Sequence, residues 1–341
     1  MKAVADDKIP FLRPALEQLV DEVVYLPGED IGPADVQDAD ILLVRTRTRC
    51  DRRLLQGSRV RFIATATIGF DHLDPAYLQE AGITWTNCPG CNATSVAQYV
   101  RNSLLLWARH TGHPIASFTV GIVGVGHVGR AVHEALKPWG CRVLLNDPPR
   151  AAQEGPAGFV PLDEVARRCD VICLHTPLTN TGPHPTHHLV DDCFLHALQR
   201  RPLLLNAGRG EVVDNAALEQ ALDEGRIAQA VVDTWEGEPN LRRSLLRKVF
   251  IGTPHIAGYS ADGKANASRM TLEALAVWMG RTPDFQILPP TLPEGLEPPP
   301  TPAEQALALY NPMADSERLK ARPDTFEYLR GHYPLRRESW D

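Results

Sequence analysis

The segment GIVGVGHVGR, residues 121–130, constrains the fold of this chain more than any other feature. Its glycines at 124, 126 and 129 follow an apolar run and precede a helical pattern. Glycines at this spacing allow a tight turn, close approach of backbone N–H groups to a phosphate, and contact between helix and strand. Asp147, eighteen residues after Gly129, stands where an acid accepts hydrogen bonds from an adenosine ribose and repels the extra phosphate of NADP. We therefore expect a dinucleotide-binding α/β unit with NAD as its cofactor.

The region around this turn has the pattern of one complete doubly wound domain. Six short apolar runs predict successive parallel strands joined by crossovers, at residues 119–123, 142–147, 170–176, 202–208, 228–234 and 250–255. Six strands with five crossovers is the size of a full dinucleotide-binding domain.

The first ninety residues predict a second open parallel sheet. Strands are expected at 2–7, 40–46, 60–66 and 83–89, and helices at 14–20, 51–56 and 75–81. Thr94 is expected to cap a long helix that leads out of this sheet. A later helix at 266–279 has an apolar face that we expect to pack back against the first sheet. The first domain is then discontinuous in sequence.

The rest of the chain divides into a linker and a short appendage. Between residues 283 and 302, eight of twenty residues are proline, which predicts a semi-rigid extended linker. The last forty residues are too few to form a core alone, so we expect them to dock on the body or on a partner subunit. The predicted boundaries are a substrate domain at 1–94, a dinucleotide domain at 95–257, a return to the substrate domain at 258–282, the linker at 283–302 and the appendage at 303–341.

Composition excludes several classes of function. The net charge is −7 without a basic stripe, which argues against nucleic-acid binding. No apolar run is long enough for a membrane helix, and the N-terminus has no export signature, so we expect a cytoplasmic protein. Seven cysteines at irregular spacing favour reduced thiols. Cys88 and Cys91 form a CPGC that is typical of a redox pair or half a zinc site, but it lacks a second motif. We therefore expect a turn and no metal.

Side chains suited to hydroxyl oxidation follow three of the predicted strands. Arg209 lies between glycines, and its planar guanidinium matches a carboxylate in bidentate geometry. His255 can take or give a proton near neutral pH. Asp233 is expected to reach the nicotinamide amide or its ribose, and Glu238 to pair with His255, with Glu236 as the alternative partner. Ligands gather at such strand ends. The set predicts oxidation of a hydroxyl next to a carboxylate with a nicotinamide cofactor.

The segments GIVGVGHVGR, LHTPL, NAGRGEVVD, VVDTWEGEP and TPHIAGY together resemble the D-isomer-specific 2-hydroxyacid dehydrogenases, over roughly residues 40–280. The resemblance implies two Rossmann-like parallel-sheet domains, a C-terminal dimerisation appendage that makes a homodimer, and catalytic roles for Arg209, Glu238 and His255. It also implies NAD contacts at the glycine turn and beyond, namely Gly124, Gly126, His127, Val128, Gly129, Asp147, Thr176, Ala207, Gly208, Asp233 and Gly258. Substrate contacts are implied at Thr46, Thr67 and Tyr259.

A phosphorylated 2-hydroxy acid needs further cations. Arg45, Arg47 and Arg49 alternate, so on an extended segment they would share one side and form a phosphate cradle. Arg45 is the first choice because it precedes Thr46 at a strand end. A solvated strand end is the other interpretation.

Two further functions remain open. The first is a dehydrogenase of the same family with another substrate, such as glycerate or 3-phosphoglycerate. The second is a corepressor or scaffold that senses NADH and binds protein partners, which the proline-rich linker and tail would suit. The intact set Arg209, Glu238 and His255 favours turnover.

Overall fold

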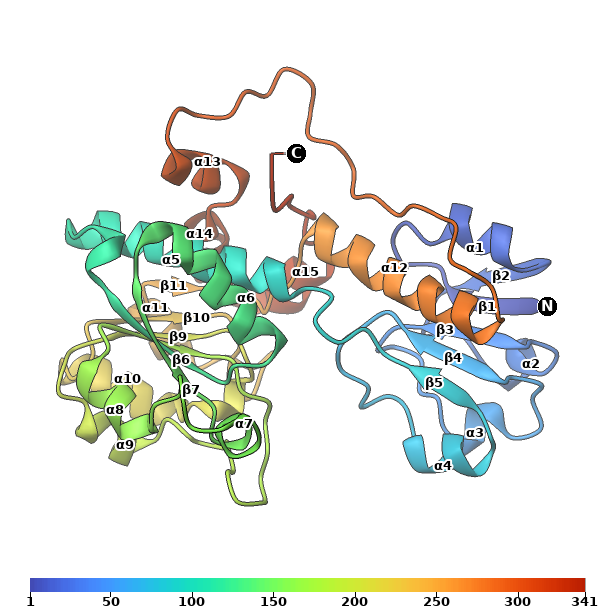
Figure 1. Cartoon of the computed structure of the whole chain (residues 1–341), viewed down its shortest axis with the longest axis horizontal. Coiled ribbons are helices and arrows are strands. Elements are labelled where there is room, and N and C mark those ends of the chain that lie inside the picture. Colours follow the sequence, from blue (N-terminus) through green and yellow to red (C-terminus); the bar gives the residue numbers. More distant parts are fainter. Residues whose placement is uncertain (341) are drawn as a thin grey trace. The chain divides into compact units, whose positions relative to one another are not determined.

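The computed structural model describes residues 1–340 and divides into two compact units, which Figure 1 shows together. Unit 1 comprises residues 1–92 and 260–292, and unit 2 comprises residues 93–259 with the chain from Pro293 onward. Each unit is built on one parallel sheet, so the predicted fold class is confirmed. The chain returns to unit 1 at Ser260.

Unit 1 contains a five-stranded parallel sheet in the order β2-β1-β3-β4-β5. Its strands are β1 (Lys2–Asp6), β2 (Glu22–Leu26), β3 (Ile41–Val44), β4 (Phe62–Thr65) and β5 (Thr84–Thr86). The sequence pattern missed β2, an edge strand with no fully buried residue. The other four strands were predicted: β1, β3 and β4 are central and buried, and β5 is the second edge strand.

Helices cover both faces of this sheet. They are α1 (Arg13–Leu19), α2 (Pro33–Val36), α3 (Arg52–Leu55), α4 (Pro75–Glu80) and the long α12 (Ala261–Trp278). Successive strand residues face opposite ways, so Ala3 and Ala5 pack with α1 and α12 while Val4 packs with α3 and α4. Ser260 accepts a hydrogen bond from the Gly263 amide and caps α12.

Unit 2 contains a six-stranded parallel sheet in the order β11-β10-β9-β8-β6-β7. Its strands are β6 (Thr119–Val123), β7 (Arg142–Asn146), β8 (Val171–Leu174), β9 (Leu203–Asn206), β10 (Gln229–Val232) and β11 (Ile251–Gly252). All six strands were predicted from their apolar runs. The helices are α5 (Ala93–Thr111), α6 (His127–Leu136), α7 (Pro148–Glu154), α8 (Leu162–Arg168), α9 (Asp192–Ala197), α10 (Asn215–Asp223) and α11 (Arg243–Lys248). Short 3₁₀ turns lie at Ile115–Ser117, Lys137–Trp139 and Gly210–Val212.

The predicted cap at Thr94 is wrong. Helix α5 begins at Ala93, so Thr94 lies inside its first turn. Boundaries shift by a residue or two where several polar side chains compete for the cap. Here Asn92, Thr94 and Ser95 are all residues that favour helix starts.

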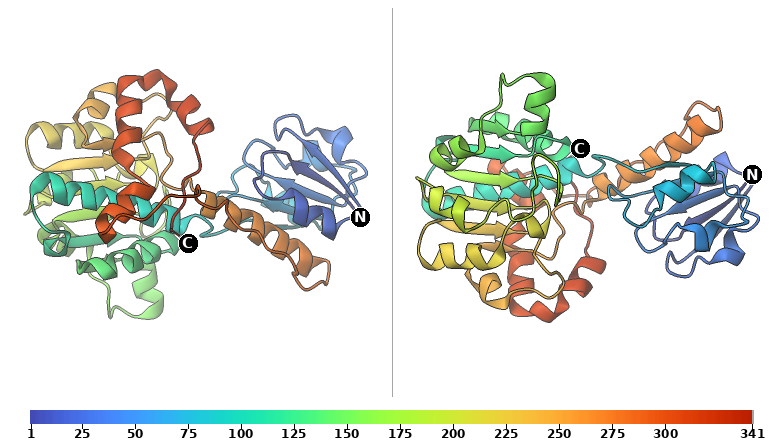
Figure 2. Two further views of the ribbon diagram at one scale, coloured as in Figure 1. Left: turned by 90° about the horizontal axis from the view of Figure 1, so that it is seen from above. Right: turned by 90° about the horizontal axis from the view of Figure 1, so that it is seen from below.

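The C-terminal segment packs on unit 2. Residues 283–301 contain no helix or strand, and then come α13 (Pro302–Leu309), α14 (Pro312–Ala321), a 3₁₀ turn at Pro323–Thr325 and α15 (Phe326–Gly331). Figure 2 shows these last helices, in red, lying over unit 2 in both views. Leu319 and Phe326 enter the core beside Trp235, and the Ser316 hydroxyl accepts a hydrogen bond from the Gly252 amide of β11 at 2.9 Å.

Beyond α15, one buried arginine ties the chain end to unit 2. Arg336 is 8% exposed and lies 3.9 Å from the centre of the Tyr310 ring. Its guanidinium donates to the carbonyl oxygens of Ile256 (3.1 Å), Ala257 (2.6 Å) and Tyr259 (2.5 Å). Backbone carbonyls buried around a cation are strong acceptors, so this clamp fixes the loop that follows His255.

We predict that Phe326→Ala lowers the free energy of unfolding by about 3–5 kcal/mol, because a fully buried aromatic ring leaves a cavity. Tyr328→Ala, two residues later and 62% exposed, should change it by no more than about 0.5 kcal/mol. Equilibrium urea denaturation measures both. Equal effects would show that α15 is not part of the core.

Candidate active site

The predicted site residues of unit 2 all follow the carboxyl ends of its strands. The glycine turn follows β6, Asp147 follows β7, Thr176 follows β8, and Ala207 to Arg209 follow β9. Asp233 and Glu238 follow β10, and His255, Gly258 and Tyr259 follow β11. Parallel strands end at one edge, and β9, β10 and β11 are neighbours in the sheet. The edge where ligands bind in open α/β sheets therefore carries the whole set.

Two of the three glycines in the turn, Gly124 and Gly129, have no room for a side chain. A Cβ at Gly129 would lie 2.1 Å from the Gly124 carbonyl oxygen, and one at Gly124, whose φ is +87°, would meet the backbone of His175 and Thr176 at 2.8–2.9 Å. Gly126 is different, since no atom within residues 1–340 would lie within 4 Å of its Cβ. Helix α6 begins directly after it, at His127. Its unpaired N–H groups and dipole favour an anion there.

Asp147 is fixed beside this turn. Its carboxylate accepts hydrogen bonds from the amides of Val125 (2.8 Å) and Arg150 (3.0 Å), and it caps α7. The carboxylate therefore lies at the end of β7 next to the glycine turn. That is the place where a ribose hydroxyl would bind in a dinucleotide fold.

The loop after β8 supplies a polar group without a partner. The Thr176 hydroxyl is buried and has no hydrogen-bond partner within residues 1–340. A Cβ at Gly208 would meet the carbonyl oxygens of Leu174 and Thr176 at 3.2–3.3 Å, so the loops after β8 and β9 are in close contact. An unsatisfied buried hydroxyl next to a glycine cradle fits a bound polar cofactor. These residues would hold NAD.

Asn206 shapes the turn that carries Arg209. Its side-chain amide donates to the Arg209 carbonyl at 2.9 Å, and its Oδ1 accepts from the Gly208 amide at 3.1 Å. Gly210 has to be glycine, because a Cβ would lie 2.0 Å from the Trp235 carbonyl oxygen. The Arg209 guanidinium is exposed and donates to the Gly208 carbonyl. It is thus oriented by the backbone and accessible to an anion.

His255 pairs with Glu238. The ring Nδ1 lies 2.5 Å from Glu238 Oε1, and both side chains are about one-quarter exposed, 27% and 23%. Glu236, the other predicted partner, instead contacts His188 Nε2 at 2.6 Å and accepts from the Asn215 amide at 3.2 Å. The geometry therefore separates the two glutamates, which the sequence alone did not.

The backbone at His255 is left-handed, with φ of +56°. This conformation is costly for a residue with a Cβ, so the surroundings must enforce it. Asp233 does so: its carbonyl accepts from the His255 amide at 2.9 Å, and its buried carboxylate accepts from the amides of Ile256 (2.8 Å) and Ala257 (2.9 Å). The Thr253 hydroxyl donates to the same carboxylate at 2.6 Å. The expected contact of Asp233 with the nicotinamide stays a prediction.

Glu238 is held as an anion. Burial opposes its ionisation, but the hydrogen bond and charge of His255 outweigh it, and the Trp235 amide and Arg330 add to that effect. The pKa of Glu238 is therefore below its ordinary value. A carboxylate fixed on one ring nitrogen orients the histidine and leaves Nε2 for proton transfer. This is an acid–base pair suited to a hydroxyl or carbonyl group.

The substrate contacts expected at Arg45, Thr46 and Thr67 belong to unit 1. Arg45 Nε and Nη2 bond the two oxygens of the buried Asp6 at 3.0 and 3.1 Å. The expected extended segment at 45–49 is wrong: β3 ends at Val44, and residues 46–48 form a turn and bend. Because the segment is not extended, the spacing of Arg45, Arg47 and Arg49 does not place their side chains on one common side. Thr67 donates its hydroxyl proton to the Gly69 carbonyl at 2.8 Å, and Thr46 is exposed.

The comparisons with known proteins agree with this geometry. Residues 92–257 match the NAD-binding domain of the D-isomer-specific 2-hydroxyacid dehydrogenases. The chain is 52% identical to erythronate-4-phosphate dehydrogenase from Bacteroides fragilis over 338 residues, covering 99% of this chain and 97% of that one. It is 44% identical to the enzyme of the same name from Pseudomonas syringae, covering 99% and 93% of the two chains. The chain belongs to the erythronate-4-phosphate dehydrogenase family.

The fold of this family is seen in solved structures of more distant proteins. An NAD-complexed D-isomer-specific 2-hydroxyacid dehydrogenase from Lactobacillus delbrueckii matches with a TM-score of 0.64 at 24% identity, covering 83% of this chain and 98% of that one. The likeness supports the fold. The matched domain and the similar erythronate-4-phosphate dehydrogenases identify an NAD-dependent dehydrogenase.

Sequence reasoning missed two residues that position the family's active-site loops. His188, with a left-handed φ of +49°, contacts Glu236 and so tethers the loop that carries Glu238. The signal was the histidine pair in the segment GPHPTHHL, residues 182–189, to which no role was assigned from the sequence. Arg336 binds three carbonyl oxygens of the loop that follows His255, and it lies in the last forty residues, for which only docking was expected.

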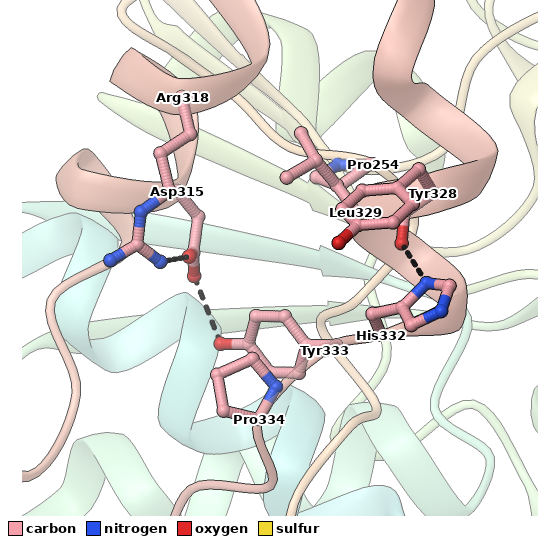
Figure 3. A pocket seen from close by; sticks show the side chains of 8 residues that line it. All are labelled: Pro254, Asp315, Arg318, Tyr328, Leu329, His332, Tyr333 and Pro334. Atoms are coloured by element: carbon pink, nitrogen blue, oxygen red, sulfur yellow. Dashed lines mark hydrogen bonds and ion pairs between the residues drawn. The ribbon is translucent and has the colours of Figure 1, made fainter.

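A cavity of about 130 Å³ lies at the junction of the C-terminal segment with Pro254. Figure 3 shows Asp315 in it, accepting hydrogen bonds from Tyr333 (2.9 Å) and Arg318 (3.2 Å). Burial raises the pKa of Asp315. The eight lining residues come from α14, α15 and their flanks apart from Pro254, so this cavity is a packing feature of the C-terminal segment.

The CPGC segment forms a turn. Cys88 and Cys91 lie in and beside a turn after β5 as unpaired thiols, and burial raises the pKa of Cys91 to about 12. No cluster of three or more metal-ligating side chains is found in residues 1–340. No helix in the same range has the length and apolar character to cross a membrane.

We predict that Glu238→Gln moves the alkaline limb of the reductive pH–rate profile to lower pH, because the amide no longer stabilises the imidazolium. Glu236→Gln serves as the matched control and should leave this limb in place, since its partner is His188. Steady-state rates from pH 5 to 10 measure both. A shift with Glu236→Gln and none with Glu238→Gln would reverse the assignment.

Proposed function

We propose that this protein oxidises 4-phospho-D-erythronate at C2 to 2-oxo-3-hydroxy-4-phosphobutanoate with NAD, a step in the synthesis of pyridoxal 5'-phosphate (vitamin B6). The relatives that cover nearly the whole chain carry the name erythronate-4-phosphate dehydrogenase. The observation that carries the proposal is the His255–Glu238 pair, fixed at the strand edge that also holds Arg209. The bound nicotinamide would accept the hydride that leaves C2.

The protein's own residues handle the carboxylate and the proton. Arg209 binds the C1 carboxylate, because its exposed fork of donors matches two oxygens. His255 takes the proton of the C2 hydroxyl while the C2–H bond breaks and the C2=O bond forms. Glu238 stabilises the imidazolium that results. In the reverse direction the same imidazolium returns its proton to the carbonyl oxygen.

The cofactor contacts of the proposal are the glycine turn with His127 and Val128 for the pyrophosphate and Asp147 for the adenosine ribose. Thr176, Ala207, Gly208, Asp233 and Gly258 would bind the nicotinamide half. The N-terminus of α6, the fixed carboxylate of Asp147 and the unpartnered Thr176 hydroxyl support this arrangement.

Substrate contacts are proposed at Thr46, Thr67 and Tyr259, with Arg45 as a phosphate ligand. Arg45 commits two nitrogens to Asp6, which fixes its direction and leaves Nη1 for an anion. We also propose a cytoplasmic homodimer. Seven unpaired cysteines suit a reducing compartment.

A different substrate within the family is the main alternative. Glycerate and 3-phosphoglycerate carry the same carboxylate and C2 hydroxyl, so Arg209, Glu238 and His255 would serve them equally. A non-catalytic NADH sensor would not need a histidine held against a carboxylate in a costly backbone conformation. The pair therefore favours an enzyme over a sensor.

We predict that a panel of 2-hydroxy acids with NAD gives NADH absorbance with 4-phospho-D-erythronate and at least tenfold slower rates with glycerate and 3-phosphoglycerate. Equal rates with the three acids would point to a less selective dehydrogenase. A panel without turnover would point to the sensor.

We predict that His255→Ala lowers kcat by about 10² to 10⁴, the usual contribution of a general base. NADH binding, measured by fluorescence titration, should change little, because the ring acts on the substrate proton. A variant that turns over normally and binds NADH weakly would place His255 in the cofactor site instead.

A further inference from the structure

Arg330 brings a positive charge from the C-terminal segment to the acid–base pair. It lies near the end of α15, and its Nη1 is 3.8 Å from Glu238 Oε1. This is the same oxygen that contacts His255 Nδ1 at 2.5 Å. Arg330 also forms a side-chain hydrogen bond with Tyr259, a proposed substrate contact. Its side chain is 30% exposed, so solvent only partly screens the charge.

The position of this guanidinium is well defined. Phe326, one turn earlier in α15, is 1% exposed and belongs to the core of unit 2. Arg336, six residues later, clamps the carbonyls of Ile256, Ala257 and Tyr259. Arg330 thus lies between two anchored residues of the same segment, Phe326 and Arg336. The backbone that carries it is therefore fixed next to Glu238.

Two cations that share one carboxylate oxygen oppose each other. A guanidinium stays charged at any pH at which the protein is folded. The Arg330 charge weakens the attraction between the Glu238 carboxylate and a charged imidazole ring, and it also repels that ring directly. Oxidation requires the neutral ring as its base, whereas a carboxylate alone would favour the charged ring.

We propose that Arg330 is a positioning residue: its charge, placed on the Glu238 oxygen that contacts His255 Nδ1, offsets part of the attraction of that carboxylate for a proton on the ring. This role of Arg330 rests on the proposed function in one respect, namely that the reaction is the oxidation of a hydroxyl group. The charge arrangement itself is independent of the identity of the substrate.

Other charged or titratable groups surround the pair. Asp233, after β10, binds the amides that follow His255. Tyr259 lies on the same loop as His255, and Glu238 on the loop after β10. Arg209, after β9, is bonded to its own Gly208 carbonyl. From α15, Arg330 is the cation in contact with the Glu238 oxygen. The expected effect of removing it is therefore a more strongly favoured imidazolium.

The test compares Arg330→Gln with Arg330→Lys and with Arg322→Gln, an exposed arginine of the same segment whose loss removes one charge. Rates are measured in both directions across pH. In Arg330→Gln, oxidation on the acid limb should fall about three- to tenfold, while reduction on the alkaline limb should rise by a similar factor. Arg330→Lys should restore most of both rates, and Arg322→Gln should change neither.

Opposite changes in the two directions separate a charge effect from a loss of structure. Equal losses in both directions at every pH would make Arg330 merely structural and overturn the proposal. A higher KM for the hydroxy acid with unmoved limbs would make it a substrate ligand, which also overturns it.

A measurement without substrate keeps this test apart from the proposed function. The ring signal of His255 is followed by NMR in histidine-labelled full-length protein and assigned from the spectrum of His255→Asn. In Arg330→Gln the ring should become charged at higher pH than in the parent. If the parent oxidises none of the acids, the proposed function fails, and the NMR titration still decides the role of Arg330. An unchanged titration overturns it.

Discussion

The buried carboxylate of Asp233 is the contact on which the rest of the active site depends. It accepts hydrogen bonds from the two amides that follow His255, and the carbonyl of the same residue accepts from the His255 amide. These contacts stabilise a left-handed backbone that would otherwise be unfavourable for histidine. The ring is thereby directed to Glu238, whose own loop is tethered by His188 through Glu236. The geometry of the proposed acid–base pair is thus set by hydrogen-bonded loops at one edge of the sheet.

The C-terminal segment belongs to this arrangement. Arg336 binds three carbonyl oxygens of the His255 loop, while Asp233 binds two of its amides, so the loop is held through both kinds of backbone group. Phe326 and Leu319 anchor the segment in the core of unit 2. The same stretch of chain delivers Arg330 to Glu238. A region that looks like an appendage in the sequence therefore supplies part of the electrostatic environment of the acid–base pair.

Periodicity and glycine spacing predicted most of the fold because buried strands such as β6, β8 and β9 are continuous apolar runs. The edge strand β2, which has no fully buried residue, was missed. At the site, the residues alone left Glu236 and Glu238 as alternatives. The structure separates them, because Glu238 contacts His255 and Glu236 contacts His188, which lies about fifty residues away in sequence. Arg336 could not be predicted either, since its partners are backbone carbonyls that carry no sequence signal. The extended segment expected at 45–49 was wrong because a turn follows Val44, and the phosphate role of Arg45 stays a prediction.

We propose that Glu238 contributes to catalysis through His255 and not by itself. A double-mutant cycle on kcat/KM with His255→Ala and Glu238→Gln tests it most directly, because residues that act as one unit are not additive. We expect Glu238→Gln to lower kcat/KM only slightly further in a protein that already carries His255→Ala. Losses that simply multiply in the double variant would contradict it, since the two side chains would then act independently.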